Sequence, residues 1–201
     1  MKLKKWELSL IAAIIITLFV TTGVSKSQSE LSEKLVRLHV VANSDSDEDQ
    51  TLKLRVRDRV LNSLAEPLDG ISDAGEAQAV IRENFGAIEG AALEEIRLSG
   101  CDYSVSVSLG TEDFPTREYD TFSLPAGEYT ALRVEIGGGA GQNWWCVVFP
   151  PLCTEIATSG DIQALALLGD EEIKLIVQEE GYVVRFKCME VLASIKAFFN
   201  R

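Results

Sequence analysis

The stretch LVRLHVVANSDSDED, residues 35–49, joins two kinds of secondary structure and decides how the chain begins to fold. Residues 35–42 are rich in β-branched side chains and predict a buried strand, which the polar run Asn43–Ser46 ends. Ser46 is followed three residues later by Asp49, the spacing of a helix N-terminal capping box, and acidic residues favour a helix start. A strand that passes directly into a helix is therefore expected.

Apolar spacing predicts two long helices after this start. In residues 46–64 one stripe repeats every four residues, at Leu52, Val56, Val60 and Leu64. Pro67 and Gly70 interrupt the pattern, and Asp73 with Glu76 restarts it with the same capping spacing. A second stripe then runs to about residue 98 through Ala77, Ile81, Phe85, Ile88, Ala92 and Ile96, which predicts one continuous helix.

The middle of the chain predicts strands. Residues 103–109 alternate apolar and serine side chains, the pattern of a half-buried strand, and 117–122, 128–136 and 144–149 follow as further strands separated by turns. Helical patterns return in the last third, most strongly at about 186–199. The order strand, helices, strands, helices predicts an α+β fold, in which an antiparallel sheet (the first strand, then a meander) packs against N-terminal and C-terminal helices.

The N-terminus has the layout of an export signal. Lys2, Lys4 and Lys5 precede 13 residues without a charge, Leu8–Val20, and no clear cleavage site follows. We interpret residues 1–25 as a signal peptide or an N-terminal membrane anchor, 26–34 as a polar linker, and 35–201 as a single extracytoplasmic domain. The net charge of −12 argues against nucleic acid as a partner.

Two stretches resemble ligand-binding loops but fail the requirements of those loops. The glycine-rich run 137–141 lacks the lysine of a phosphate-binding loop, and we expect its glycines to allow positive φ and close backbone approach. Asp45, Asp47 and Asp49 resemble the start of a calcium loop, but Gln50 and Val56 stand where glycine and glutamate are needed. No metal or cofactor site is expected.

Cysteines raise two alternatives. Cys101, Cys146, Cys153 and Cys188 all follow the export signal, so up to two disulfides are expected, with three pairings open. Alternatively, Cys146 or Cys153 could act as a nucleophile with His39, the one histidine, as base. That pairing would make the protein an exported hydrolase of cell wall or peptide.

Aromatic and proline residues suggest a recognition surface. Asn143, Trp144, Trp145, Phe149, Pro150, Pro151 and Leu152 form the first candidate partner-binding segment. Adjacent tryptophans on a strand point to opposite faces, so one serves the core and the other meets a second layer or a partner. The alternative is that the C-terminal helices cover both. A second candidate patch comprises His39, Asn43 and Asp45.

Two of these segments resemble a known family. Val36–Asp45, continued by residues 48–58, and Gly141–Cys153 are similar to the two motifs of the stage II sporulation protein R family, and Val184–Lys187 also fits. The resemblance implies a non-catalytic signalling protein, secreted from the forespore into the space between the forespore and mother-cell membranes. There such a protein activates a membrane-embedded aspartic protease, which matures the precursor of a mother-cell sigma factor. No cofactor is implied.

Overall fold

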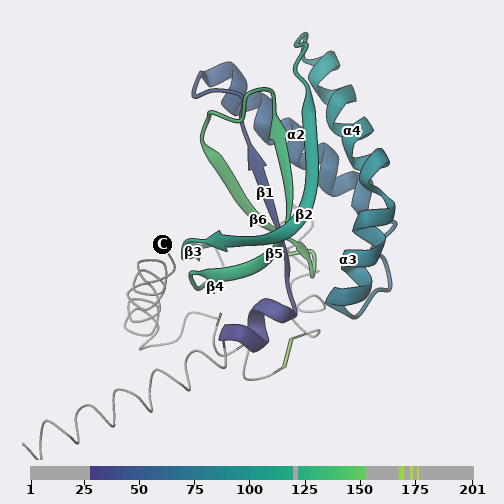
Figure 1. Cartoon of the computed structure of the whole chain (residues 1–201), viewed down its shortest axis with the longest axis vertical. Coiled ribbons are helices and arrows are strands. Elements are labelled where there is room, and N and C mark those ends of the chain that lie inside the picture. Colours follow the sequence, from purple (N-terminus) through teal and green to yellow (C-terminus); the bar gives the residue numbers. More distant parts are fainter. Residues whose placement is uncertain (1–27, 120–121, 153–167, 170–172, 174–175, 177–201) are drawn as a thin grey trace, which may run out of the picture. The chain divides into compact units, whose positions relative to one another are not determined.

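The computed structural model describes residues 28–119, 122–152, 168–169, 173 and 176 (Figure 1). The chain forms two compact units. Among the described residues, the larger unit comprises 32–114, 128–152 and 168–169. The smaller unit includes 28–31, 115–119 and 122–127. The fold combines helices with a mixed sheet, which confirms the predicted α+β class.

Helix α2, Asp47–Ala65, begins where the capping residues place it. The Ser46 side chain accepts a hydrogen bond from the Asp49 backbone N–H at 3.2 Å, and three acidic residues occupy the first turn. Its buried residues include the whole predicted stripe, Leu52, Val56, Val60 and Leu64. Here local capping and apolar spacing indicate the same helix, so both predictions are confirmed.

The second predicted helix is two helices. Helix α3, Ala74–Glu83, is capped by Asp73 as expected, but it ends at Asn84, and α4, Phe85–Leu98, follows at once. Asn84 leaves the helical region with φ −99° and ψ 10°, and its side-chain amide donates to the Val80 carbonyl at 2.8 Å. The apolar spacing missed this break because Ile81 and Ile88 are both buried in the same core.

The main sheet has the strand order β2-β5-β1-β6. Its strands are β1, Val36–Val41; β2, Val105–Phe114; β5, Gly127–Ile136; and β6, Asn143–Phe149. β1 pairs with β6 antiparallel but with β5 parallel. The expected antiparallel meander is therefore wrong in its connections, because β1 lies between β5 and β6. All six residues of β1 are buried, as suits a central strand.

The two faces of this sheet have different chemistry. Val36, Leu38 and Val40 of β1 belong to one apolar cluster with the buried residues of α2, α3 and α4. Figure 1 shows these helices gathered on one side of the strands. Arg37, His39 and Val41 alternate with them and therefore point to the opposite face. We call that opposite face the polar face.

The smaller unit contains a two-stranded sheet of β3, Arg117–Glu118, and β4, Ser123–Leu124, paired antiparallel. The predicted strand 117–122 is thus confined to its first two residues in the described part.

Residues 28–33, expected as polar linker, are helical, and Leu31 is buried among them. The peptide bond between Phe149 and Pro150 is cis. The predicted segments 1–25 and 186–199 lie outside the described residues.

Candidate functional site

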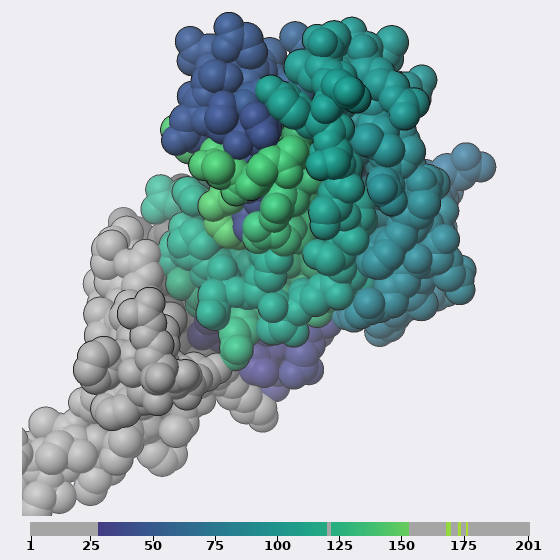
Figure 2. All heavy atoms as spheres, turned by 45° about the horizontal axis from the view of Figure 1, so that its top comes forward, coloured from purple at the N-terminus to yellow at the C-terminus, as the bar shows by residue number. Residues whose placement is uncertain are grey.

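The glycine run is a loop that docks on the end of β1. The N–H groups of Gly141 and Ala140 donate to the carbonyls of Ala42 and Asn43, at 2.9 and 3.2 Å. The Gly138 N–H donates to the Asn43 side-chain oxygen at 2.9 Å. In Figure 2 the green surface of this region lies directly against the blue start of α2. The two segments that resemble family motifs therefore meet in space.

Three positions in this loop require glycine, among them Gly139 with φ +57°. Gly137 has φ +58°, and a Cβ there would lie 2.9 Å from the Asn43 Cγ. A Cβ on Gly141 would contact the Ser44 carbonyl oxygen and lie 2.6 Å from its carbon. The predicted roles, positive φ and close backbone approach, are both confirmed. The backbone donors of the loop are directed at the protein itself, which leaves phosphate binding unsupported.

The acidic residues after β1 also serve the loop and the helix start. Asp45 Oδ1 accepts from the Gln142 N–H at 2.7 Å. Asp49 is buried and accepts from the Ser44 hydroxyl at 2.5 Å and from the Asn43 amide at 2.9 Å. These hydrogen bonds, Ser44 first, hold the pKa of Asp49 below its ordinary value of 3.8. Hydrogen bonding to Asp49 in turn raises the pKa of Tyr103.

Lys53 ties α2 to the same loop. Its ammonium group donates to the Gln142 carbonyl at 3.0 Å and to the Gln50 side-chain oxygen at 2.6 Å. The residue is buried, and this burial lowers the pKa of Lys53. Loop 137–142, the end of β1 and the first turns of α2 thus form one hydrogen-bonded support for the start of β6.

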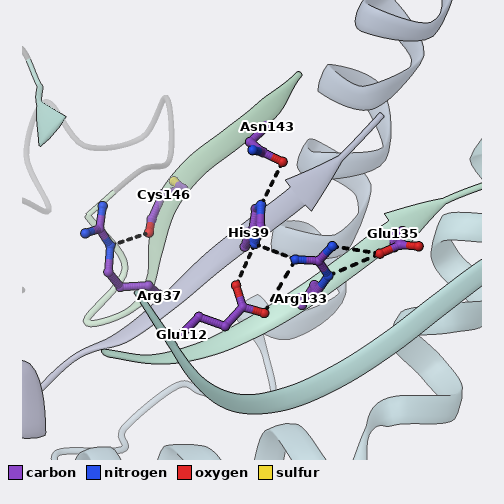
Figure 3. A network of polar contacts seen from close by, with 7 residues as sticks. All are labelled: Arg37, His39, Glu112, Arg133, Glu135, Asn143 and Cys146. Carbon is purple, nitrogen blue, oxygen red and sulfur yellow. Dashed lines mark hydrogen bonds and ion pairs between the residues drawn. The ribbon is translucent and has the colours of Figure 1, made fainter. Parts of the chain in front are cut away.

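His39 organises a cluster on the polar face (Figure 3). Its Nε2 lies 2.9 Å from the side-chain oxygen of Asn143 on β6, and its Nδ1 lies 2.6 Å from a carboxylate oxygen of Glu112 on β2. The His39 side chain is only 5% exposed. Three strands therefore hold the imidazole ring in one position.

Charged residues of β2 and β5 extend this cluster toward solvent. Arg133 Nη1 lies 3.3 Å from His39 Nδ1 and 3.7 Å from Glu112, and its Nη2 donates to Glu135 at 2.8 Å. The side chains of Arg133 and Glu135 are each 33% exposed. We call His39, Glu112, Arg133, Glu135, Asn143 and Trp145 the His39 cluster.

Aromatic rings complete the polar face. Trp145 stacks on the His39 ring with centroids 3.9 Å apart, and Phe114 meets Trp145 edge-on at 4.6 Å. Arg37 is fully buried, with its guanidinium 4.0 Å from the Phe114 ring centre and its Nε 3.5 Å from the Cys146 carbonyl oxygen. Stacking and cation–π contacts therefore fix Trp145 and its neighbours.

Trp144 occupies the other face, as the alternation on a strand predicts. It packs against the apolar core, and the Arg57 guanidinium lies 4.5 Å from its ring centre. Phe149, Pro150 and Leu152 are buried, whereas Pro151 is exposed. Asn143 is exposed like Pro151, and Trp144 and Trp145 are half-buried, so partner binding by this segment stays a prediction.

The cysteines narrow the expectation of up to two disulfides and overturn the proposed pairing of Cys146 with His39. Cys146 is disulfide-bonded, and Cys153 and Cys188 lie outside the described residues. Cys101 is free and half-buried, so the four cysteines do not form two disulfides. Cys146 also packs in the helix-facing core, on the opposite side of the sheet from His39. A Cys146–His39 dyad is therefore wrong.

The structure adds three residues that the sequence did not single out, Glu112, Arg133 and Glu135. Arg133 and Glu135 alternate with apolar residues on β5, so strand periodicity could have identified their shared face, whereas Glu112 lies between Thr111 and Asp113 and gave no such signal. Of the predicted second patch, His39 lies in the cluster, whereas Asn43 and Asp45 support the glycine loop. Among the described residues, no group of three or more His, Cys, Asp or Glu side chains could hold a metal ion.

Comparisons with known proteins agree on one family. The family model described as stage II sporulation protein R matches residues 32–159. Stage II sporulation protein R of Bacillus subtilis (strain 168) is 42% identical over 123 residues, which are 61% of this chain and 55% of that protein. The match thus spans about half the length of the curated relative. No solved structure matches this chain.

Proposed function

Because the chain belongs to the stage II sporulation protein R family and so has a role in sporulation, we propose that it is a secreted signal. In this proposal it activates a membrane-embedded aspartic protease, and that protease matures the precursor of a mother-cell sigma factor. The chain acts by binding and carries out no catalysis of its own.

One observation carries this proposal: the two motif segments of the sequence converge on the His39 cluster. β1 supplies His39, β6 supplies Asn143 and Trp145, and the glycine loop fixes the start of β6. Side chains held this firmly lose little conformational entropy when they bind, which favours recognition. Cys146 does not supply the nucleophile that a hydrolase would need at this cluster, since it is disulfide-bonded and faces away, and Cys153 lies outside the described residues.

Activation by binding requires that the signal prefer the active state of the protease. The exposed end of the His39 cluster offers Asn143, the Arg133–Glu135 ion pair and the half-buried edge of Trp145. We propose that these groups contact an extracytoplasmic part of the protease. A partner with a carboxylate and an amide could replace the water around Arg133 and Asn143 when it binds.

Export follows from the same proposal. Residues 1–25 would direct the chain across the forespore membrane and then be removed or retained as an anchor. These residues lie outside the part of the chain that the structure describes. Within the described part, no helix is long and apolar enough to span a bilayer.

The proposal is tested by reconstituting the signal. The full-length chain is co-expressed with the protease and the tagged sigma precursor, and processing is followed by immunoblot. Asn143→Ala and Trp145→Ala are compared with Arg59→Ala, a control whose side chain pairs with Glu94 on the helix layer. We expect the first two to reduce processing at least fivefold and the control to leave it unchanged.

Each variant is also purified and its thermal midpoint measured, so that loss of signalling is separated from loss of folding. Asn143→Ala removes the side-chain oxygen that lies 2.9 Å from the buried His39 Nε2, so it should cost about 1–3 kcal/mol and still fold. If Asn143→Ala and Trp145→Ala both fold and both support full processing, the His39 cluster does not contact the protease. If the parent chain triggers no processing, the proposed function is refuted.

A further inference from the structure

β2 is an outer strand of the main sheet (Figure 1). Its neighbour is β5, and no strand pairs with its other edge in the part of the chain that the structure describes. An unpaired strand edge presents backbone N–H and C=O groups that can accept a further strand. The edge is therefore a candidate binding site distinct from the His39 cluster.

Backbone geometry shows which residues of β2 face outward. The Ser104 carbonyl accepts from the Gly137 N–H at 2.8 Å, so Ser104 faces β5. Successive residues of a strand direct their backbone groups to opposite sides. The backbone N–H and C=O groups of Val105, Val107 and Leu109 therefore point away from β5. Arg82 Nη1, which lies 3.5 Å from the Leu109 carbonyl oxygen, supports this assignment. The outward groups of Val105 and Val107 remain for a partner strand.

The side chains of β2 itself do not protect its outer edge. Natural edge strands commonly carry lysine, proline or a bulge that prevents pairing. β2 reads VSVSLGTEDF and has neither lysine nor proline. Ser106 and Ser108 are exposed, and their small side chains leave the backbone accessible on that face. The positive charge at this edge is Arg82, beside the Leu109 carbonyl, so the stretch open to an incoming strand is the one around Val105 and Val107.

Charge indicates which kind of strand would bind. Asp102 and Asp113 are exposed at the two ends of this stretch. Asp47 and Glu48 line a hollow just before β2 that also includes Arg55 and Cys101, so two carboxylates there face one guanidinium. A second copy of the chain fits poorly, because antiparallel self-pairing centred on Val107 places Asp102 opposite Glu112. Like charges directly opposite one another destabilise a pair of strands. A basic strand would be attracted instead.

We propose that the outer edge of β2 binds an extended, basic segment of a partner protein by strand addition. Main-chain hydrogen bonds to Val105 and Val107 provide the affinity, and the acidic ends select the charge. That the partner is the protease rests on the proposed function, whereas binding of a basic strand does not.

The test uses the full-length chain and a fluorescein-labelled peptide of alternating lysine and valine, seven residues long. Binding is measured by fluorescence anisotropy. Two matched peptides serve as controls: one has glutamate in place of lysine, and one has a central proline that removes a backbone donor. We expect saturable binding of the basic peptide that weakens with added salt. The two control peptides should bind at least tenfold more weakly.

Protein variants locate the peptide. Val107→Pro removes the outward N–H and should weaken binding at least tenfold, whereas Ser106→Ala leaves the backbone unchanged and should bind within twofold of the parent. If Val107→Pro fails to fold, Ser108→Lys provides the test instead. This variant adds one exposed positive charge at the edge and should weaken binding of the basic peptide about fivefold. Equal binding of the acidic peptide, no binding of the basic peptide, or unchanged affinity of a folded Val107→Pro or Ser108→Lys would overturn the proposal.

The same variants separate this inference from the proposed function. If the parent chain triggers precursor processing and Ser108→Lys triggers it equally, the edge does not serve the protease while the signalling role stands. If the parent does not trigger processing but binds the basic peptide, the edge site stands and the proposed function fails.

Discussion

Replacing Gly141 with alanine tests the docking of the glycine loop against a matched control in the same loop. A Cβ at Gly141 would contact the Ser44 carbonyl oxygen, lie 2.6 Å from the Ser44 carbonyl carbon and lie 2.9 Å from the Ala42 Cβ. Backbone atoms cannot rotate away as a side chain does, so the loop or the end of β1 must move. At Gly138 a Cβ would lie 3.7 Å from the nearest atom, an ordinary contact.

The cost can be estimated from the hydrogen bonds that a shift would weaken. Gly141, Ala140 and Gln142 each donate a backbone N–H to the segment 42–45, at 2.9, 3.2 and 2.7 Å. A hydrogen bond of this kind contributes about 1 kcal/mol net, and forced overpacking costs about 1–3 kcal/mol. We expect Gly141→Ala to lower the free energy of unfolding by about 2–3 kcal/mol. Gly138→Ala should change it by less than about 1 kcal/mol.

Urea denaturation followed by tryptophan fluorescence measures both variants. With a slope of about 1–3 kcal/mol per molar urea, the expected loss lowers the Gly141→Ala midpoint by about 0.7–3 M at an unchanged slope. Gly138→Ala should unfold close to the parent midpoint. Equal midpoints for the two variants would refute the reasoning, because they would show that Gly141 has room for a side chain.

Three further predictions follow from single contacts. Asp49 has a lowered pKa in the folded chain, so its contribution to stability is present above its ordinary value of 3.8 and lost as pH falls through the folded value. Asp49→Asn should therefore be less stable at pH 7 and lose less stability than the parent between pH 5 and 2, as read from urea midpoints. Trp144→Ala should cost about 2–4 kcal/mol of unfolding free energy, because the ring packs on the helix-facing core. Iodoacetamide should label Cys101 in the native chain, and peptide masses should show Cys146 labelled only after reduction.

Local features of the sequence identified most of the elements. Ser46 and Asp73 cap α2 and α3 as their spacing indicated, since a cap depends on residues three positions apart. The strands β1, β5 and β6 begin and end within a residue or two of their predicted limits. Alternation also placed Trp144 and Trp145 on opposite faces.

Pairing of strands was less predictable, because it depends on residues far apart in the chain. A meander is the simplest connection of consecutive strands, yet β1 inserts between β5 and β6. The signal was present in β1 itself: Arg37 and His39 lie in a strand whose other residues are apolar, and both are buried. A strand buried on both faces belongs in the centre of a sheet.

Only part of the candidate site was predictable, because its contacts also join residues far apart in the chain. His39 and Asn143 were each singled out from their own segments, but their contact follows from the β1–β6 register, which places Trp145 opposite His39. Glu112 and Arg133 reach His39 from β2 and β5, so no local motif connects them to it. Sequence patterns identified His39 and Asn143 on their own strands. Only the strand order of the sheet brings them together with Glu112 and Arg133.

Some residues of the two motif segments stabilise the glycine loop, and others are exposed on the polar face. Experiments can distinguish the two roles. Gly141 and Asp45 hold the loop that starts β6, so changes there should reduce stability and signalling together. Asn143 is exposed and contributes to the polar face, so its loss should reduce signalling by more than the lost hydrogen bond to His39 reduces stability. A motif residue that affects signalling is therefore no proof of contact with a partner. Only variants that lower signalling by more than their loss of stability explains can define the binding surface.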